Sequence, residues 1–92
     1  IWVELERIES KMFELFEKAK NNPRGLRFDE VKRLCKCIGM RRDRVKGSHF
    51  IYKMDEPFFL LSIQRMKDGK AKAYQVRQLV DFIEENNLDI KD

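Results

Sequence analysis

The sequence predicts a small α+β protein in which a three-stranded antiparallel meander carries two helices on one face. Three observations support this class. Two segments repeat apolar residues at helical spacing, and between them three short stretches alternate apolar and polar residues. Turn residues separate those stretches, as between adjacent antiparallel strands. A further amphipathic segment comes first, so the expected order is helix, then helix–strand–strand–strand–helix.

The first helix is expected over residues 2–20, and Asn21-Asn22-Pro23 then gives a stop signal. Its apolar residues recur at alternating spacings of three and four, namely Leu5, Ile8, Met12, Leu15 and Ala19. We treat residues 1–22 as an extension that precedes a domain of residues 23–92. The apolar stripe can pack on that domain, cover the open face of its sheet or join two copies as a homodimer, and the sequence leaves these alternatives open.

The two helices of the domain are expected over residues 28–38 and 74–86. Gly39 follows the first of them, at the position where a left-handed residue commonly ends a helix. Between the strands and the last helix, residues 65–73 are expected to form a mobile basic loop. The apolar faces of the two helices consist of Val31, Leu34, Cys35 and Ile38, and of Val76, Leu79, Val80 and Ile83.

Three strands are expected over residues 40–45, 49–54 and 58–64. The first is polar and basic, which favours an edge position or half exposure. Alternation along the other two sorts their side chains between the two faces of the sheet. If one face meets the helices, it holds Phe50, Tyr52, Phe59, Leu61 and Ile63. The open face then presents an apolar patch beside a histidine, formed by His49, Ile51, Phe58 and Leu60, and such a patch usually implies a covering partner.

The positive charge of the chain is concentrated in its middle. The net charge is +4, but residues 24–77 carry 15 Lys/Arg against six Asp/Glu, while both flanking segments are acidic. A basic centre is typical of a protein that binds a polyanion. No apolar run approaches the length of a membrane span and no secretory signal is visible, so we expect no membrane partner and a cytoplasmic location.

The sequence offers no pattern for a metal or a cofactor. Cys35 and Cys37 lie two residues apart in a predicted helix, and the only histidine is remote from them. They therefore lack the partners of a zinc site, and no cluster of carboxylates is placed to hold magnesium. We expect a protein that works without either.

His49 follows the turn Lys46-Gly47-Ser48 and is the only histidine in the sequence. Arg44, Lys46 and Lys53 flank it along the chain. An imidazole titrates near neutral pH and fixed cations neutralise phosphate charge, so these groups suit the cleavage of a phosphodiester. A β-turn with a surface histidine is the alternative that these residues alone leave open.

Several motifs between residues 24 and 88 carry a family likeness. The most specific is Gly47-Ser48-His49, and it is accompanied by Phe50-Ile51-Tyr52, Gly69-Lys70-Ala71-Lys72 and Tyr74-Gln75-Val76-Arg77. In these motifs the chain resembles the HicA-type toxins of bacterial toxin–antitoxin pairs. The resemblance implies a fold like the double-stranded-RNA-binding domain, cleavage of mRNA, and a HicB-type antitoxin that masks the site. It also implies that His49 is catalytic and that Gly47 and Ser48 form the turn presenting it.

The sequence departs from that family in two places. Residues 1–22 have no counterpart in its short members, and Gln64-Arg65-Met66-Lys67 differs from the Pro/His-containing segment of many members. The first departure leaves the role of the extra helix open. The second concerns substrate contacts around the basic loop.

The leading hypothesis is a metal-independent endoribonuclease with one catalytic histidine. RNA carries its own nucleophile, the 2′-hydroxyl, so the protein need only remove that proton, protonate the leaving 5′-oxygen and neutralise the phosphate charge. We expect His49 to make one of the proton transfers, as the base on the 2′-hydroxyl. Ser48 shapes the turn or contacts phosphate. The expected phosphate contacts are Arg44, Lys46, Ser48, Lys53, Lys70 and Lys72.

Two other functions remain open from the sequence. A non-catalytic double-stranded-RNA-binding module would place Lys67, Lys70 and Lys72 on phosphates and would bind in a salt-sensitive manner, indifferent to His49. A domain that binds only proteins would use the exposed apolar patch and the N-terminal helix.

Overall fold

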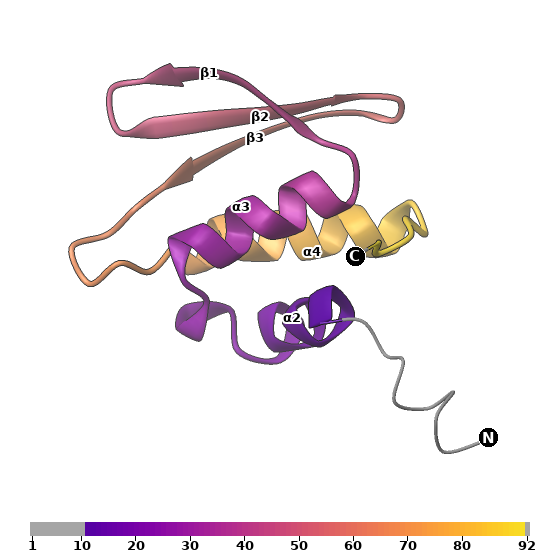
Figure 1. Ribbon diagram of the computed structural model, residues 1–92, viewed down its shortest axis with the longest axis horizontal. Coiled ribbons are helices and arrows are strands. Elements are labelled where there is room, and N and C mark those ends of the chain that lie inside the picture. The colour runs from indigo at the N-terminus through magenta and orange to yellow at the C-terminus, as the bar shows by residue number, and fades with distance from the viewer. Residues whose placement is uncertain (1–10, 92) are drawn as a thin grey trace.

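A computed structural model describes residues 11–91 and has an α+β architecture. Figure 1 shows three layers: the sheet, then helices α3 and α4 against one of its faces, then α2 on the far side of those helices. The described part of the chain has three α-helices and one antiparallel sheet in the order β1-β2-β3. The elements are α2 (Lys11–Asn21), the 3-10 turn η1 (Pro23–Gly25), α3 (Phe28–Cys37), β1 (Arg41–Lys46), β2 (His49–Asp55), β3 (Phe58–Gln64) and α4 (Ala73–Glu85).

Helix α2 covers the second half of the helix expected over residues 2–20, and residues 2–10 of that expectation lie outside the described part. Leu15, Phe16 and Ala19 are buried in the same hydrophobic core as residues of α3 and α4. Residues 11–22 therefore pack on the rest of the chain, which is one of the alternatives expected for this segment. Its use in a homodimer remains a prediction.

The start of α3 is fixed by Glu30, whose carboxylate accepts a hydrogen bond from the Arg27 backbone N–H at 2.8 Å. This is one half of a capping box. The same carboxylate accepts hydrogen bonds from the Lys18 ammonium of α2 at 3.2 and 3.3 Å. Burial alone would raise the pKa of Glu30, but these hydrogen bonds outweigh it and hold that pKa below its ordinary value. Glu30 thus links the first two described helices.

The predicted division of the sheet into a covered and an open face is confirmed. On the covered face, Tyr52, Leu61 and Ile63 are almost completely buried. The Phe50 and Phe59 rings on the same face pack against Phe28 of α3 and Phe82 of α4, with centroid separations of 5.1 and 3.9 Å. On the open face, by contrast, Phe58 is 65% exposed, Leu60 is 46% exposed and His49 is exposed.

The segment between β3 and α4 is an ordered turn rather than the free loop expected from its composition. The backbone N–H of Met66 donates to the Lys70 carbonyl at 2.8 Å, and that of Ala71 donates to the Leu26 carbonyl at 3.0 Å. Isolated bridges pair Arg27 with Lys70 and Arg65 with Ala71. Because Ala71 is fully buried, this basic turn (residues 65–72) is docked on the chain just before α3.

Candidate functional site

The site is built on the hairpin that joins β1 to β2. Gly47 and Ser48 are the two turn residues, and Gly47 has a φ of +60°. Two-residue hairpin turns need a positive φ at the first central position, which glycine adopts without strain. The turn sets Lys46 directly opposite His49. Residues that face each other across two strands project from the same side of the sheet, so this imidazole and this ammonium group share the open face.

The His49 ring hydrogen-bonds to a side chain that the sequence analysis did not assign to the site. Its Nδ1 lies 2.9 Å from the Oγ of Ser62 on β3. Within residues 11–91, Nε2 has no hydrogen-bond partner and His49 is exposed, so this second nitrogen is accessible to a ligand. The signal that could have found Ser62 was alternation, which places it on the open face together with Phe58 and Leu60.

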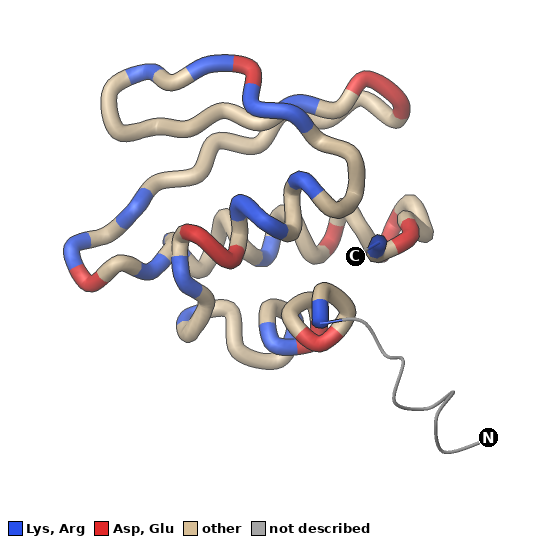
Figure 2. Tube along the Cα trace, in the orientation of Figure 1, with Lys and Arg blue, Asp and Glu red and all other residues tan. Residues whose placement is uncertain are grey.

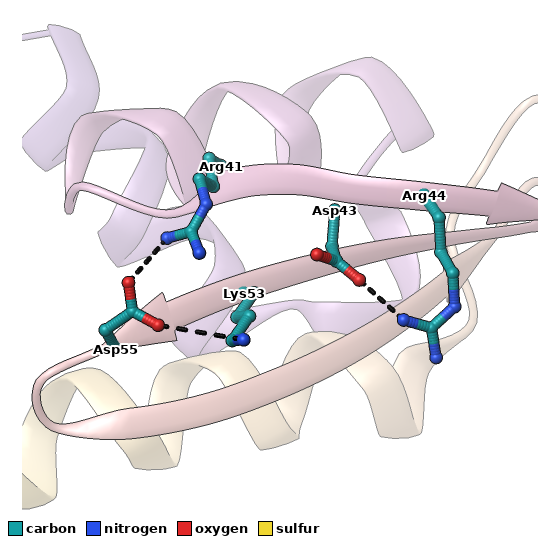
Figure 3. Close-up of polar contacts among 5 residues, drawn as sticks. All are labelled: Arg41, Asp43, Arg44, Lys53 and Asp55. Carbon is teal, nitrogen blue, oxygen red and sulfur yellow. Dashed lines mark hydrogen bonds and ion pairs between the residues drawn. The ribbon is translucent and has the colours of Figure 1, made fainter.

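A second cation of β1, Arg44, lies on the histidine side of the sheet, and a bulge follows it on the side away from the turn. Arg42 pairs with Tyr52 and Arg44 pairs with Ile51, so Asp43 is an extra residue without an opposite partner. Strict alternation would have put Arg42 and Arg44 on one face. Arg44 and Lys46 both lie between the bulge and the turn and share the open face, whereas the bulge moves Arg42 to the other face and sets Arg41 opposite Lys53. The guanidinium of Arg44 donates to the carboxylate of Asp43, as Figure 3 shows.

Lys53 is on the open face as well, but it does not lie beside His49. It comes four residues later on β2, which corresponds to about 13 Å along a strand. Its ammonium lies 3.8 Å from the Asp55 carboxylate, which also accepts a hydrogen bond from Arg41 at 2.8 Å (Figure 3). The Arg41 hydrogen bond holds the pKa of Asp55 below its ordinary value. The structure therefore brings Lys46 and Arg44 to the hairpin tip and leaves Lys53 at the other end of β2.

Two glutamines support the strand end next to the histidine, and neither was expected in the site. Gln64 is the direct partner of His49 on β3, and its side-chain amide donates to the Ser48 Oγ at 3.5 Å. The Gln64 backbone N–H donates to the Gln75 Oε1 at 2.9 Å. Gln75 is only 2% exposed, and its Nε2 donates to the Tyr74 hydroxyl at 3.3 Å. A buried amide of α4 thus holds the outer edge of β3 in place.

Lys70 and Lys72 lie on a different element, the turn of residues 65–72. Figure 1 shows the 65–72 turn and the β1–β2 turn at the same end of the long axis of the molecule. Figure 2 shows basic residues gathered on this basic turn and along β1 and α3. Both lysines are half-buried, and no ion pair to a described acidic residue holds either of them. The end of the molecule that carries His49 is therefore the end at which these cations lie.

Metal and membrane features are not found in the described residues. Among residues 11–91, no group of three or more His, Cys, Asp and Glu side chains is placed to hold a metal ion. None of the described helices is long and apolar enough to cross a membrane. Cys35 is buried, which raises the pKa of its thiol, and the Cys37 thiol donates to the Leu34 carbonyl at 3.2 Å.

The comparisons with known proteins add no family to this geometry. The chain matches no protein-family model, no curated protein and no solved structure. Its function must therefore be inferred from the chemistry at the hairpin tip together with the likeness in its sequence motifs.

Proposed function

We propose that the chain is the toxin of a type II toxin–antitoxin pair of the HicA type, and that it cleaves mRNA as a metal-independent endoribonuclease. The order α3–β1–β2–β3–α4 is that of a double-stranded-RNA-binding domain, which is the fold we propose for residues 23–92. The observation that supports the activity most is the position of His49. Its imidazole is exposed at a hairpin tip, with the Lys46 ammonium on the opposite strand.

In the proposed reaction, the Nε2 of His49 accepts the proton of a ribose 2′-hydroxyl. The 2′-oxygen then forms a bond to the adjacent phosphorus, and the bond from phosphorus to the 5′-oxygen breaks. The products are a 2′,3′-cyclic phosphate and a 5′-hydroxyl, whose proton comes from the imidazolium or from water. General base catalysis by one residue accelerates a reaction roughly a hundred- to ten-thousand-fold. The turnover of an enzyme with a single catalytic histidine is therefore expected to be modest.

The cations of the open face stabilise the charge that builds on the phosphate. Lys46 is the first choice, because it faces His49 and none of the described carboxylates pairs with it. Arg44 comes next on the same strand, and it exchanges Asp43 for a phosphate oxygen when RNA binds. Lys53, at the far end of β2, contacts a flanking nucleotide instead.

Contacts further along the RNA come from two turns. Ser48 offers a hydroxyl next to His49, and Lys70 and Lys72 offer ammonium groups from the basic turn. These groups bind phosphates on either side of the cleaved bond. They contribute affinity that falls with salt, since phosphate contacts release bound counterions.

The partner in this proposal is a HicB-type antitoxin that covers the open face. Ile51 lies next to His49 on that face, and Leu60 and Phe58 continue its apolar surface toward the far end of β2, where most of Phe58 is exposed. A protein seated there buries apolar area and blocks access of RNA to His49 at the same time. The proposed location is the cytoplasm, where mRNA is available.

A non-catalytic double-stranded-RNA-binding module is the second candidate. It is favoured by the basic turn, which is docked on the chain just before α3, leads into α4 and carries Lys67, Lys70 and Lys72. Such a module recognises the shape and phosphates of an A-form helix. It binds RNA without cutting it, and its affinity does not depend on His49.

The test is cleavage of a labelled RNA oligonucleotide by the purified protein with EDTA present. We expect cleavage of the RNA, products that end in a cyclic phosphate, and no cleavage of the same oligonucleotide carrying 2′-deoxyribose. Activity that disappears on chelation would mean that a metal takes part. RNA binding without cleavage at any condition would favour the double-stranded-RNA-binding module.

A further inference from the structure

The contact between His49 and Ser62 assigns a specific task to a serine of β3. Among the described residues, Ser62 is the only hydrogen-bond partner of the imidazole, with 2.9 Å between Nδ1 and Oγ. Ser62 pairs directly with Ile51, so it lies diagonally across from His49 on the same open face. It is half-buried, whereas the neighbouring Leu60 is 46% exposed.

We propose that Ser62 is a positioning residue that fixes the orientation and the tautomer of His49 for proton transfer. The proposal rests on the proposed nuclease function. The two nitrogens of an imidazole are not equivalent, and the nitrogen that the protein engages decides which one faces the substrate. In the form that the proposed reaction needs, the Nδ1–H of the neutral ring donates to the Ser62 Oγ and the lone pair of Nε2 faces the 2′-hydroxyl.

A hydroxyl group suits this task because its oxygen can accept a hydrogen bond from the Nδ1–H both before and after the proton transfer. Before the reaction, the Nδ1–H donates to the Ser62 Oγ and Nε2 is unprotonated. After Nε2 has taken the 2′-proton, the same Nδ1–H still donates to the same oxygen, so the ring need not turn. The bond that is broken is O2′–H and the bond that is formed is Nε2–H.

The charged groups that face His49 come from β1. Lys46 lies directly opposite and Arg44 lies two residues further back, whereas β3 presents the neutral side chains of Ser62 and Gln64. Along β2 itself, Lys53 is the nearest charged residue on this face and pairs with Asp55. Ser62 therefore orients the ring without adding a negative charge that would favour a permanently protonated imidazolium.

The backbone of β3 holds Ser62 at this distance. Two residues beyond it, the Gln64 N–H donates to the buried amide of Gln75 at 2.9 Å. Gln64 is also the direct partner of His49. Gln75 of α4 therefore fixes the position of the end of β3. This in turn keeps Ser62 within hydrogen-bond distance of His49.

The first measurement is the ¹⁵N NMR spectrum of the imidazole nitrogens in the intact chain, at a pH where the ring is neutral. His49 is the only histidine in the sequence, so the spectrum contains one ring. We expect the hydrogen on Nδ1 in the wild type and a shift toward the Nε2–H form in Ser62→Ala. Ser62→Thr, which keeps the hydroxyl, should retain the wild-type form. An Nε2–H ring in the wild type, or the same tautomer in all three proteins, would overturn the proposal.

The second measurement is the rate of RNA cleavage by the same three proteins, each checked for its unfolding temperature. Loss of one neutral hydrogen bond should lower kcat about three- to tenfold in Ser62→Ala while KM changes little. Ser62→Thr should recover most of that loss. If the wild type does not cleave RNA, the nuclease proposal fails, and the NMR result still decides whether Ser62 sets the tautomer.

Discussion

The two faces of the sheet are made from alternate residues of the same strands, yet different forces decide their composition. On the covered face, Tyr52, Leu61 and Ile63 are buried against α3 and α4. On the open face, His49, Phe58 and Leu60 remain in contact with solvent. Packing constrains the size and shape of the first set, because each of these side chains fills part of a close-packed core. The second set is not required for the core, so its residues are available for a ligand.

The largest effect on stability should separate two neighbouring leucines. Leu61 is 1% exposed and Leu60 is 46% exposed, although they are adjacent on β3. Leu61→Ala should lower the free energy of unfolding by about 2–5 kcal/mol, since it leaves a cavity in the core. Leu60→Ala should lower it by less than about 1 kcal/mol, because much of that side chain is already hydrated. Urea unfolding of both variants makes the comparison, and equal losses would mean that the two faces do not differ as described.

A smaller effect is expected where α2 meets α3. Glu30→Gln should cost about 1 kcal/mol, because it weakens the hydrogen bonds from the Arg27 N–H and from Lys18. The folded-state pKa of Glu30 is below its ordinary value of 4.5, so its stabilising contribution is complete above that pH. It is lost as the pH falls from there through the lower folded-state pKa.

The check is thermal unfolding of wild type and Glu30→Gln between neutral and acidic pH. The gap in free energy should be largest near neutral pH and should close in acid. Glu85→Gln, an exposed glutamate of α4, is the matched control and should show no such gap. A gap that stays constant with pH would show that the charge of Glu30 is not what stabilises the helix pair.

The hairpin tip combines an effect no larger than that of Glu30→Gln with the smallest effect of all. Gly47 has a φ of +60°, and no heavy atom lies within 4 Å of a Cβ built there. Gly47→Ala therefore meets no clash, and it should lower the free energy of unfolding by only the cost of a left-handed backbone at alanine, about 1 kcal/mol. Ser48→Ala, at the neighbouring turn residue, should be nearly neutral. Unfolding temperatures of the two variants test this, and a Gly47→Ala protein that unfolds at the wild-type temperature would contradict the turn geometry.

Alternation and helical spacing predicted most of the fold, because burial acts on every residue of an element at once. The buried positions of Tyr52 and Val76 and the exposed position of His49 all followed from such patterns. The order of the described elements and the antiparallel pairing of the strands followed as well. These features depend on periodicity, which is present in the sequence itself.

The parts of the site that were missed depend on contacts between distant residues. The bulge at Asp43 puts Arg41 rather than Arg42 on the open face, and no local sequence pattern predicts it. The hydrogen bond between His49 and Ser62 could be predicted only with the register of β2 and β3 in hand. The role of Gln75 could be predicted only by knowing that the Gln64 backbone N–H needs an acceptor. Lys53 was grouped with His49 because the two residues are close in sequence. In the extended strand β2 their separation of four residues places them far apart.

The most direct measurement compares RNA cleavage and unfolding temperature for wild type and His49→Ala, purified and assayed side by side with EDTA present. Because His49 lies on the open face, the unfolding temperature should stay within about 2 °C of wild type. Because its imidazole is proposed to take the 2′-proton, the rate of cleavage should fall by roughly a hundredfold or more. Equal cleavage by the two proteins would remove His49 from the reaction and would contradict the assignment of the open face as the catalytic face.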